Sequence, residues 1–225
     1  MLSFFYLLNR LRLRKAVIVE FLGAPAVGKS TTYDLVNKRL GGVLRASELR
    51  RLTIKNVGLE FYFFLISYLV NGGNRDCSLR FLKELMYFFR VVEIDLKAVG
   101  AGRPVILEEG VAHNFMPALL SGVSEGQFEL FLRNRVFIYL RADSAELVLS
   151  RLRSREIGKG VFLAGHVGLC DVEIVSRVDL YQVQADALVE KIKAAGGRVL
   201  VLSASDSAKD NSHAVLSLLQ ELNCE

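Results

Sequence analysis

One nine-residue stretch, Gly23-Ala-Pro-Ala-Val-Gly-Lys-Ser-Thr31, constrains the fold of this chain more than any other feature. It follows a short apolar run at residues 16–22, which is typical of a buried strand, and it precedes a helical pattern from about Ser30 to Leu40. Two glycines separated by four residues and followed by Lys and Ser, between a strand and a helix, match the phosphate-binding P-loop pattern in full. We therefore expect a sheet whose first strand leads into a P-loop.

This loop offers several groups to a phosphate chain. Its glycines let the backbone wrap closely around phosphates, and its N–H groups add to the positive end of the following helix dipole. Lys29 can reach the β- and γ-phosphates, and the hydroxyl of Ser30 can join the shell of a Mg²⁺ ion. The predicted nucleotide-binding residues of the loop are Gly23, Ala26, Val27, Gly28, Lys29, Ser30 and Thr31.

Apolar runs recur along the chain and predict five strands, at residues 16–22, 43–46, 104–107, 135–140 and 198–202. Helical patterns lie between them, at about 48–99, 111–134, 144–153, 169–195 and 207–222, and residues 154–168 are expected to form a loop. Near-continuous apolar strands that alternate with helices predict an α/β fold of three layers, with a parallel five-stranded sheet of the P-loop NTPase type. All strands should then end at the same edge, where ligands bind.

Two acidic residues, Glu108 and Glu109, end the strand at 104–107. Magnesium nucleotide chemistry needs a carboxylate near the metal and a base for the attacking group. Because side chains alternate along a strand, we expect Glu108 to act at the metal together with Ser30, and Glu109 to face the acceptor or solvent. A solvated turn is the alternative interpretation.

A group of arginines follows the fourth predicted strand. Arg151 and Arg155 lie one helical turn apart, and we expect them to close over the transferring phosphoryl group and spread its charge. Arg153 would then point elsewhere. The alternative is a basic helix end, which the helix dipole stabilises.

These features together resemble those of the P-loop kinases of the nucleoside and nucleotide monophosphate type, particularly the thymidylate-kinase-like group. The resemblance extends from about residue 17 to about residue 207 in motif order. It implies phosphoryl transfer from ATP with Mg²⁺ to a small molecule, and it makes residues 154–168 a small lid whose arginines, with Arg151 and Arg155, clamp the ATP phosphates. Only the P-loop is highly specific among these motifs.

The resemblance also assigns roles outside the P-loop. The loop after the last strand lines the adenine in that group, which implicates Ala204 and Ser205. Arg45 and Arg90 lie where the group often contacts its acceptor. Glu109 stands where those kinases commonly have an arginine that holds the acceptor phosphate, so an acceptor hydroxyl, as on a nucleoside or a sugar, fits better than a monophosphate.

Charge and hydropathy limit the partners. The 225 residues have a net charge of +5, and residues 1–15 contain four basic residues and no acid, so the remaining chain is nearly neutral. This distribution argues against a nucleic-acid-binding surface. We expect residues 1–15 to form a basic apolar helix, either at a membrane surface or packed on the domain or on a partner chain, with residues 16–225 as one kinase-like domain.

The rest of the chain favours a cytoplasmic protein that is membrane-peripheral if residues 1–15 bind lipid. The apolar run at 59–70 is too short to span a bilayer, and apolar helices at 59–70 and 79–92 could pair two chains as a homodimer. Three scattered cysteines, Cys77, Cys170 and Cys224, support neither a disulfide framework nor a zinc site.

Three functions compete at this point. The leading hypothesis is an ATP- and Mg²⁺-dependent small-molecule kinase. A nucleotide-binding regulatory or membrane-peripheral protein with little catalysis is the alternative, which the N-terminal segment and Glu109 motivate. A GTPase is disfavoured because Arg141-Ala-Asp143 stands where an Asn-Lys-x-Asp guanine motif would be expected.

Overall fold

The structure, a computed structural model, describes residues 11–12, 17–41, 44–49, 79–102, 104–159 and 168–224. The strands are β1 (Leu11–Arg12), β2 (Ile18–Leu22), β3 (Leu40–Gly41), β4 (Leu44–Arg45), β5 (Val105–Leu107), β6 (Arg135–Arg141) and β7 (Arg198–Ser203). The helices are α2 (Lys29–Arg39), α3 (Ala46–Leu49), α5 (Leu79–Gly100), α6 (Val111–Asn114), α7 (Met116–Ser121), α8 (Glu125–Leu132), α9 (Ala145–Lys159), α10 (Asp171–Ala194) and α11 (Ala208–Cys224).

The main sheet has five strands in the order β4-β5-β2-β6-β7, and all neighbours are parallel. β2 is central, since Ile18 pairs with Val105 of β5 on one side and with Arg135 of β6 on the other. This position explains why all five residues of β2 are buried. The predicted parallel five-stranded sheet with helices on both faces is therefore confirmed.

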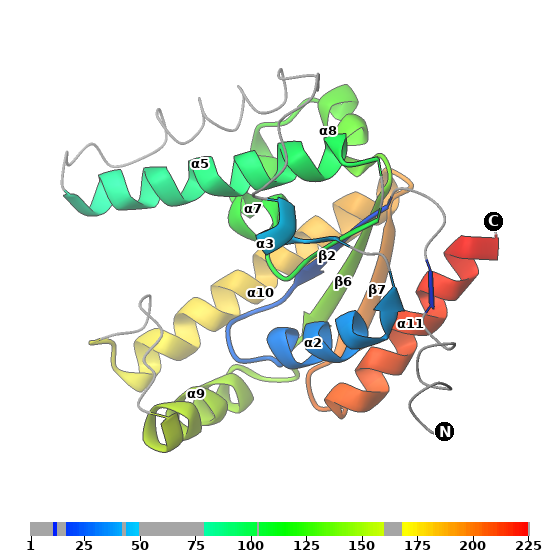
Figure 1. The fold of residues 1–225 in the computed structure, drawn as a ribbon. Coiled ribbons are helices and arrows are strands. Elements are labelled where there is room, and N and C mark those ends of the chain that lie inside the picture. Colours follow the sequence, from blue (N-terminus) through cyan, green and yellow to red (C-terminus); the bar gives the residue numbers. More distant parts are fainter. Residues whose placement is uncertain are drawn as a thin grey trace, which may run out of the picture.

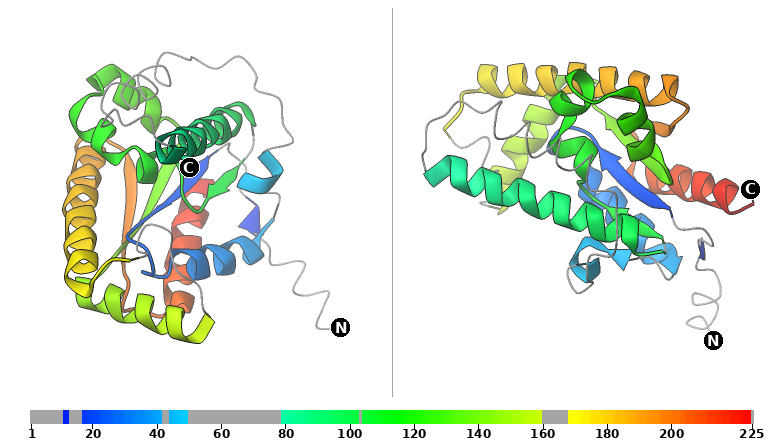
Figure 2. Two further views of the ribbon diagram at one scale, coloured as in Figure 1. Left: turned by 90° about the vertical axis from the view of Figure 1, so that its left-hand side faces the viewer. Right: turned by 90° about the horizontal axis from the view of Figure 1, so that it is seen from above.

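Helices cover both faces of the sheet (Figures 1 and 2). On one face, alternate residues such as Val19 and Phe21 of β2 pack with Ile138 of β6 in a core completed by residues of α2, α9 and α11. On the other face, Phe137 and Tyr139 of β6 pack with residues of α5, α6, α7, α8 and α10. The two cores hold the carboxyl ends of β2, β5 and β6 rigidly side by side, which is where the P-loop begins.

Several boundaries differ from the expectation. Residues 111–132 form three short helices instead of one, because Pro117 lies in the first turn of α7 and Ser124 forms a capping box with Gln127 at the start of α8. Residues 154–159 belong to α9, so the expected loop at 154–168 does not begin there. Residues 11–12 form a short strand beside β3 instead of continuing a helix.

Some expectations lie outside the described residues: most of the N-terminal segment, the apolar run at 59–70, Cys77 and the lid residues 160–167. Cys170 is described as a free, exposed thiol. Across the part of the chain that the structure covers, no helix has the length and apolar character needed to cross a bilayer.

Candidate active site

The P-loop connects β2 to α2 at the carboxyl edge of the sheet (Figure 1). Its first residue, Gly23, has a φ of 142°, and a Cβ there would lie 2.5 Å from the backbone oxygen of Leu140. A side chain at this position is therefore excluded both by conformation and by the close approach of β6. Gly28 also has a positive φ and leads directly into Lys29, the first residue of α2. The loop thus has the strand–loop–helix context that the motif requires.

Lys29 points back into the loop and is only 5% exposed. Its Nζ donates to the carbonyl oxygens of Gly23 (2.6 Å) and Ala24 (3.1 Å) and lies 3.5 Å from Oε1 of Glu109. Burial lowers the pKa of this ammonium below its usual value, and the carboxylates of Glu109 and Glu108 oppose that shift. The ammonium group that we expected to contact phosphates therefore lies inside the P-loop.

The hydroxyl of Ser30 donates to Oε1 of Glu108. The two residues are brought together because β2 and β5 are adjacent parallel strands, so the loops that follow them begin side by side. A hydroxyl oxygen and a carboxylate oxygen are the kind of ligands that Mg²⁺ takes, with waters and phosphate oxygens completing its shell. This pair therefore fits the magnesium site that the resemblance implies, although the described residues contain no cluster of three or more His, Cys, Asp or Glu residues suited to a metal.

Glu109 points to a different set of partners from Glu108. Besides Lys29, its Oε1 lies 3.6 Å from Nε2 of His113, the third residue of α6. Nδ1 of the same ring is 2.7 Å from the hydroxyl of Tyr181 on α10, and that hydroxyl accepts from the Gly23 N–H (3.3 Å). Burial, helped by the charge of Lys29, lowers the pKa of His113 to about 3, so the imidazole is neutral at physiological pH.

A buried glutamate holds the turn that carries these acids. Oε1 of Glu20 on β2 accepts from the backbone N–H groups of Ala112 (2.6 Å) and His113 (3.2 Å), and Oε2 lies 3.4 Å from Arg135. The carboxyl is fully buried, which raises the pKa of Glu20 to about 7, although Arg135 opposes the shift. A Cβ on Gly110 would lie 2.6 Å from Cδ of Glu20, so a side chain at 110 would displace this buried carboxyl from its hydrogen bonds.

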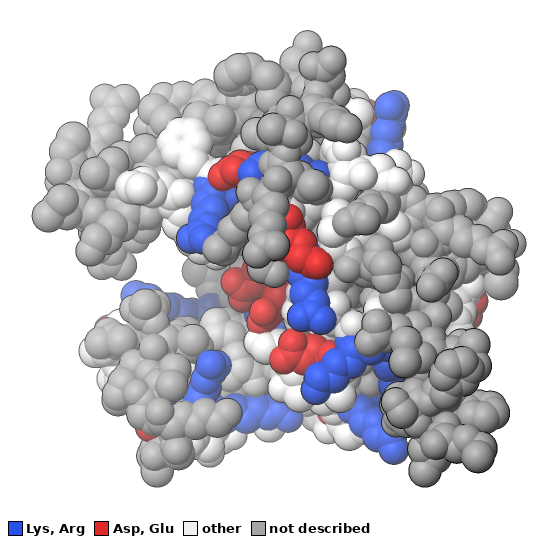
Figure 3. Space-filling model, in the orientation of Figure 1, with Lys and Arg blue, Asp and Glu red and all other residues white. Residues whose placement is uncertain are grey.

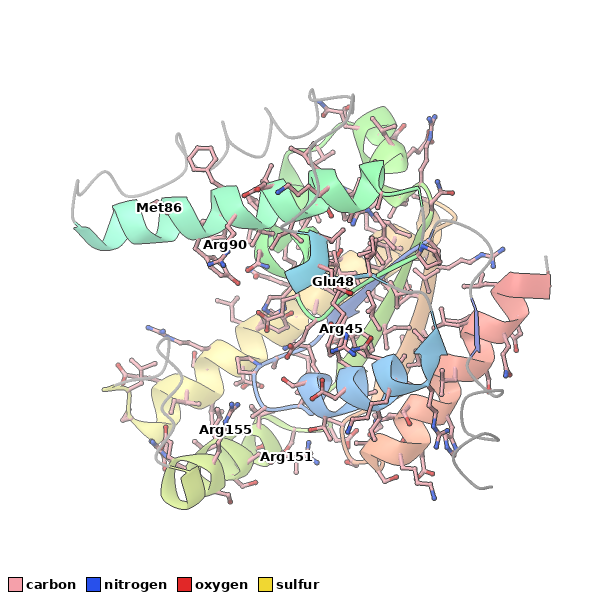
Figure 4. The ribbon with its side chains drawn as sticks, viewed as in Figure 1. Arg45, Glu48, Met86, Arg90, Arg151 and Arg155 are labelled. Atoms are coloured by element: carbon pink, nitrogen blue, oxygen red, sulfur yellow. The ribbon has the colours of Figure 1, made fainter. Side chains whose placement is uncertain are left out.

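The arginines of α9 have different surroundings. Arg151 donates to the carbonyl oxygens of Val27 (3.3 Å) and Ala204 (2.8 Å), so it joins the P-loop to the loop after β7. Arg153 pairs with Asp171 and Glu156, pointing elsewhere as expected. Arg155 is exposed, and in Figure 4 it extends from α9 toward the space between α9 and α5. Arg151 and Arg155 therefore do not act as a matched pair in this structure.

The predicted acceptor residues lie around the same edge. Figure 3 shows this face hollowed between α5 and α9, with acidic and basic side chains gathered at the inner end. Arg90 extends from α5 into this region, and Arg45, the last residue of β4, lies close to Glu48, which accepts from the Arg45 N–H (2.8 Å) (Figure 4). Ser205, in the loop after β7, is exposed, and its N–H donates to the hydroxyl of Ser203 (3.0 Å).

Glu20, His113 and Tyr181 were not among the candidates taken from the sequence. Glu20 carried a local signal, since an acid inside an otherwise apolar strand needs a buried partner. His113 and Tyr181 are 68 residues apart and become neighbours only when α10 packs beside α6, so no local pattern identifies them.

No protein-family model and no curated protein sequence matches the chain. Among solved structures, deoxyadenosine kinase from M. mycoides with bound products matches with a TM-score of 0.53 at 14% sequence identity, covering 91% of this chain and 100% of that chain. The same enzyme with bound dATP gives a TM-score of 0.53 at 13% identity, with the same coverage. Shikimate kinase from Acinetobacter baumannii matches with a TM-score of 0.49 at 14% identity, covering 93% of this chain and 96% of that chain. With its parallel five-stranded sheet and its loop at the carboxyl edge, the chain has the fold of the P-loop kinases.

Proposed function

We propose that the chain transfers the γ-phosphoryl group of ATP, with Mg²⁺, to a hydroxyl group of a small molecule of the nucleoside, nucleotide or sugar class. Residues 16–225 would form this one catalytic domain, related in kind to the thymidylate-kinase-like group. The nucleotides bound by deoxyadenosine kinase, dATP and the products dCMP and dCDP, support a nucleotide ligand for this fold.

One observation carries the proposal: the hydroxyl of Ser30 meets the carboxylate of Glu108 one residue beyond a buried P-loop lysine. A glycine-rich turn between strand and helix would need none of these three groups. Together they supply a cation for phosphate and two oxygens for a metal, at the edge where parallel α/β sheets bind their ligands.

Each residue then has a defined task. Ser30 and Glu108 would hold Mg²⁺, which when bound neutralises charge on the phosphate oxygens. The N–H groups of the P-loop and Lys29 orient the phosphate chain, and Arg155 can approach the transferring group from α9. The acceptor oxygen bonds to the γ-phosphorus as the bond from that phosphorus to the β,γ-bridging oxygen breaks. The hydroxyl proton passes to Glu108, or to a water that Glu108 holds.

The surroundings of Glu109 favour a hydroxyl acceptor without a phosphate of its own. Its side chain is 40% exposed and its Oε1 lies 3.5 Å from Nζ of Lys29, so it would repel an acceptor phosphate near the P-loop. Arg45 of β4 and Arg90 of α5 come from elements other than the turn that carries Glu109, and they would contact other parts of the acceptor (Figure 4).

A second function, nucleotide binding with little catalysis, is favoured by a different observation. Lys29 is engaged by two carbonyl oxygens and by Glu109, an arrangement that suits a chain in which the lysine seldom contacts a γ-phosphate. This reading predicts nucleotide binding without appreciable turnover.

Measured ADP release distinguishes the two. With MgATP and a panel of nucleosides, nucleoside monophosphates and sugars, we expect turnover with at least one acceptor, and Lys29→Ala should reduce kcat by about 100-fold or more. Lys193→Ala is the matched control, because Lys193 is 46% exposed, pairs with Glu190 and lies at the C-terminal end of α10, 12 residues beyond Tyr181. Binding of MgATP without turnover of any acceptor would support the second function, and absence of both would refute each of them.

A further inference from the structure

Polar groups of five residues form a closed ring at the start of the P-loop. The Gly23 carbonyl accepts from Lys29 Nζ (2.6 Å), and the Gly23 N–H donates to the hydroxyl of Tyr181 (3.3 Å). This hydroxyl is 2.7 Å from Nδ1 of His113, whose Nε2 is 3.6 Å from Oε1 of Glu109. Oε1 of Glu109 is in turn 3.5 Å from Lys29 Nζ, which closes the ring. Three separate segments, the P-loop, the residues after β5 and the middle of α10, are therefore joined in one ring of polar contacts.

The two charged side chains of this ring differ in their exposure to water. The ammonium group of Lys29 is almost completely buried, whereas the carboxylate side chain of Glu109 is 40% exposed. Because the lysine is screened from water, its attraction to a nearby carboxylate is only weakly reduced by salt. The carboxylate has the same sign as a phosphate oxygen and lies against the ammonium that the phosphate would contact.

We propose that Glu109 is a built-in competitor of the nucleotide polyphosphate for Lys29, and that it thereby sets the affinity of the P-loop. The incoming phosphates draw Lys29 away from Glu109 and are repelled by its charge. His113 lies against the carboxylate of Glu109 and is itself held by the hydroxyl of Tyr181, so both residues act through Glu109 as positioning residues. This inference rests on the proposed function, because it takes a polyphosphate as the ligand of the P-loop.

The test is a calorimetric titration of the full chain with MgATP and, separately, with inorganic tripolyphosphate. Glu109→Gln keeps the size of the side chain and removes its charge, and it should tighten both dissociation constants about tenfold. Glu109→Ala is a second variant at this 40% exposed position and should also tighten binding. Glu190→Gln removes the same charge from a residue whose side chain is 72% exposed near the C-terminal end of α10, and it should leave both constants unchanged.

A double-mutant cycle tests the positioning role. His113→Asn removes the contact with Glu109, so it should change the affinity for tripolyphosphate in the wild-type background and have no further effect once Glu109→Gln is present. Equal effects in both backgrounds would show that His113 does not act through Glu109 and would overturn that part of the inference.

The outcomes separate this inference from the proposed function. If the wild-type chain binds MgATP or tripolyphosphate and both Glu109 variants bind no more tightly, the inference is overturned while the kinase proposal stands. If neither the wild-type chain nor any variant binds either ligand, both are overturned. Tighter binding by the variants supports the competitor role whether or not a turned-over acceptor has been found.

Discussion

Two buried groups near the P-loop should respond to acid in opposite directions. The carboxyl of Glu20 has its pKa raised from 4.5 to about 7 by burial, so the folded chain binds this proton more tightly than the unfolded chain. The imidazole of His113 has its pKa lowered from 6.5 to about 3, so the unfolded chain binds this proton more tightly. Acidification therefore favours the folded state through Glu20 and the unfolded state through His113.

The two effects are of similar size. Between about pH 7.5 and about pH 5, Glu20 should add about 2 kcal/mol to the free energy of unfolding, and His113 should remove about 2 kcal/mol. The two contributions nearly cancel in the wild-type chain. A variant that lacks one group should show the effect of the other group on the free energy of unfolding. His113→Asn should become more stable on acidification, and Glu20→Gln should become less stable.

Urea unfolding followed by circular dichroism measures this directly, because the free energy of unfolding can be compared at the two pH values for each protein. The difference between pH values is used instead of the absolute stability, since each substitution also changes local packing. Glutamine keeps an acceptor oxygen for the N–H groups of Ala112 and His113, so the start of α6 remains capped. Similar pH dependence in the two variants, or slopes with exchanged signs, would refute the reasoning.

The other predictions concern the P-loop and the arginines of α9. Gly23→Ala places a Cβ 2.5 Å from the oxygen of Leu140 at a φ of 142°, so it should lower the free energy of unfolding by about 2–4 kcal/mol and abolish tripolyphosphate binding; a variant that binds normally in calorimetry would contradict this. Arg155→Ala should lower kcat by about 10–100-fold in the ADP-release assay at unchanged thermal stability. Arg151→Ala should instead lower the free energy of unfolding by about 1–2 kcal/mol, because it removes the bonds to two backbone carbonyls, and the reverse pattern would exchange the two roles.

The features that the sequence predicted well are those encoded in short stretches. The P-loop is a contiguous motif, and apolar runs located β2, β5, β6 and β7 to within one or two residues. The contact between Ser30 and Glu108 followed from one further rule, that the ends of neighbouring parallel strands meet. The starts of α7 and α8 also have local signals in the sequence, namely Pro117 and the capping box of Ser124 and Gln127. The expectation of one long helix overlooked both signals.

The features that could not be predicted depend on packing between distant segments. Gly23 and Tyr181 are separated by 158 residues, and their hydrogen bond exists only because α10 crosses behind the P-loop. Likewise, the spacing of Arg151 and Arg155 suggested a matched pair, but one of them reaches backbone carbonyls of two other loops. Helical spacing predicts which residues share one face of a helix, but it does not predict which other segments that face contacts.

The contact between Glu20 and Gly110 makes these two positions dependent on each other. A Cβ at 110 would lie within 2.6–2.9 Å of three carboxyl atoms of Glu20, so a larger residue at 110 would displace the end of the Glu20 side chain. Such a shift would weaken the acceptor at the first turn of α6 and the contact with Arg135. An engineer who redesigns the acidic turn therefore has to consider the central strand with it.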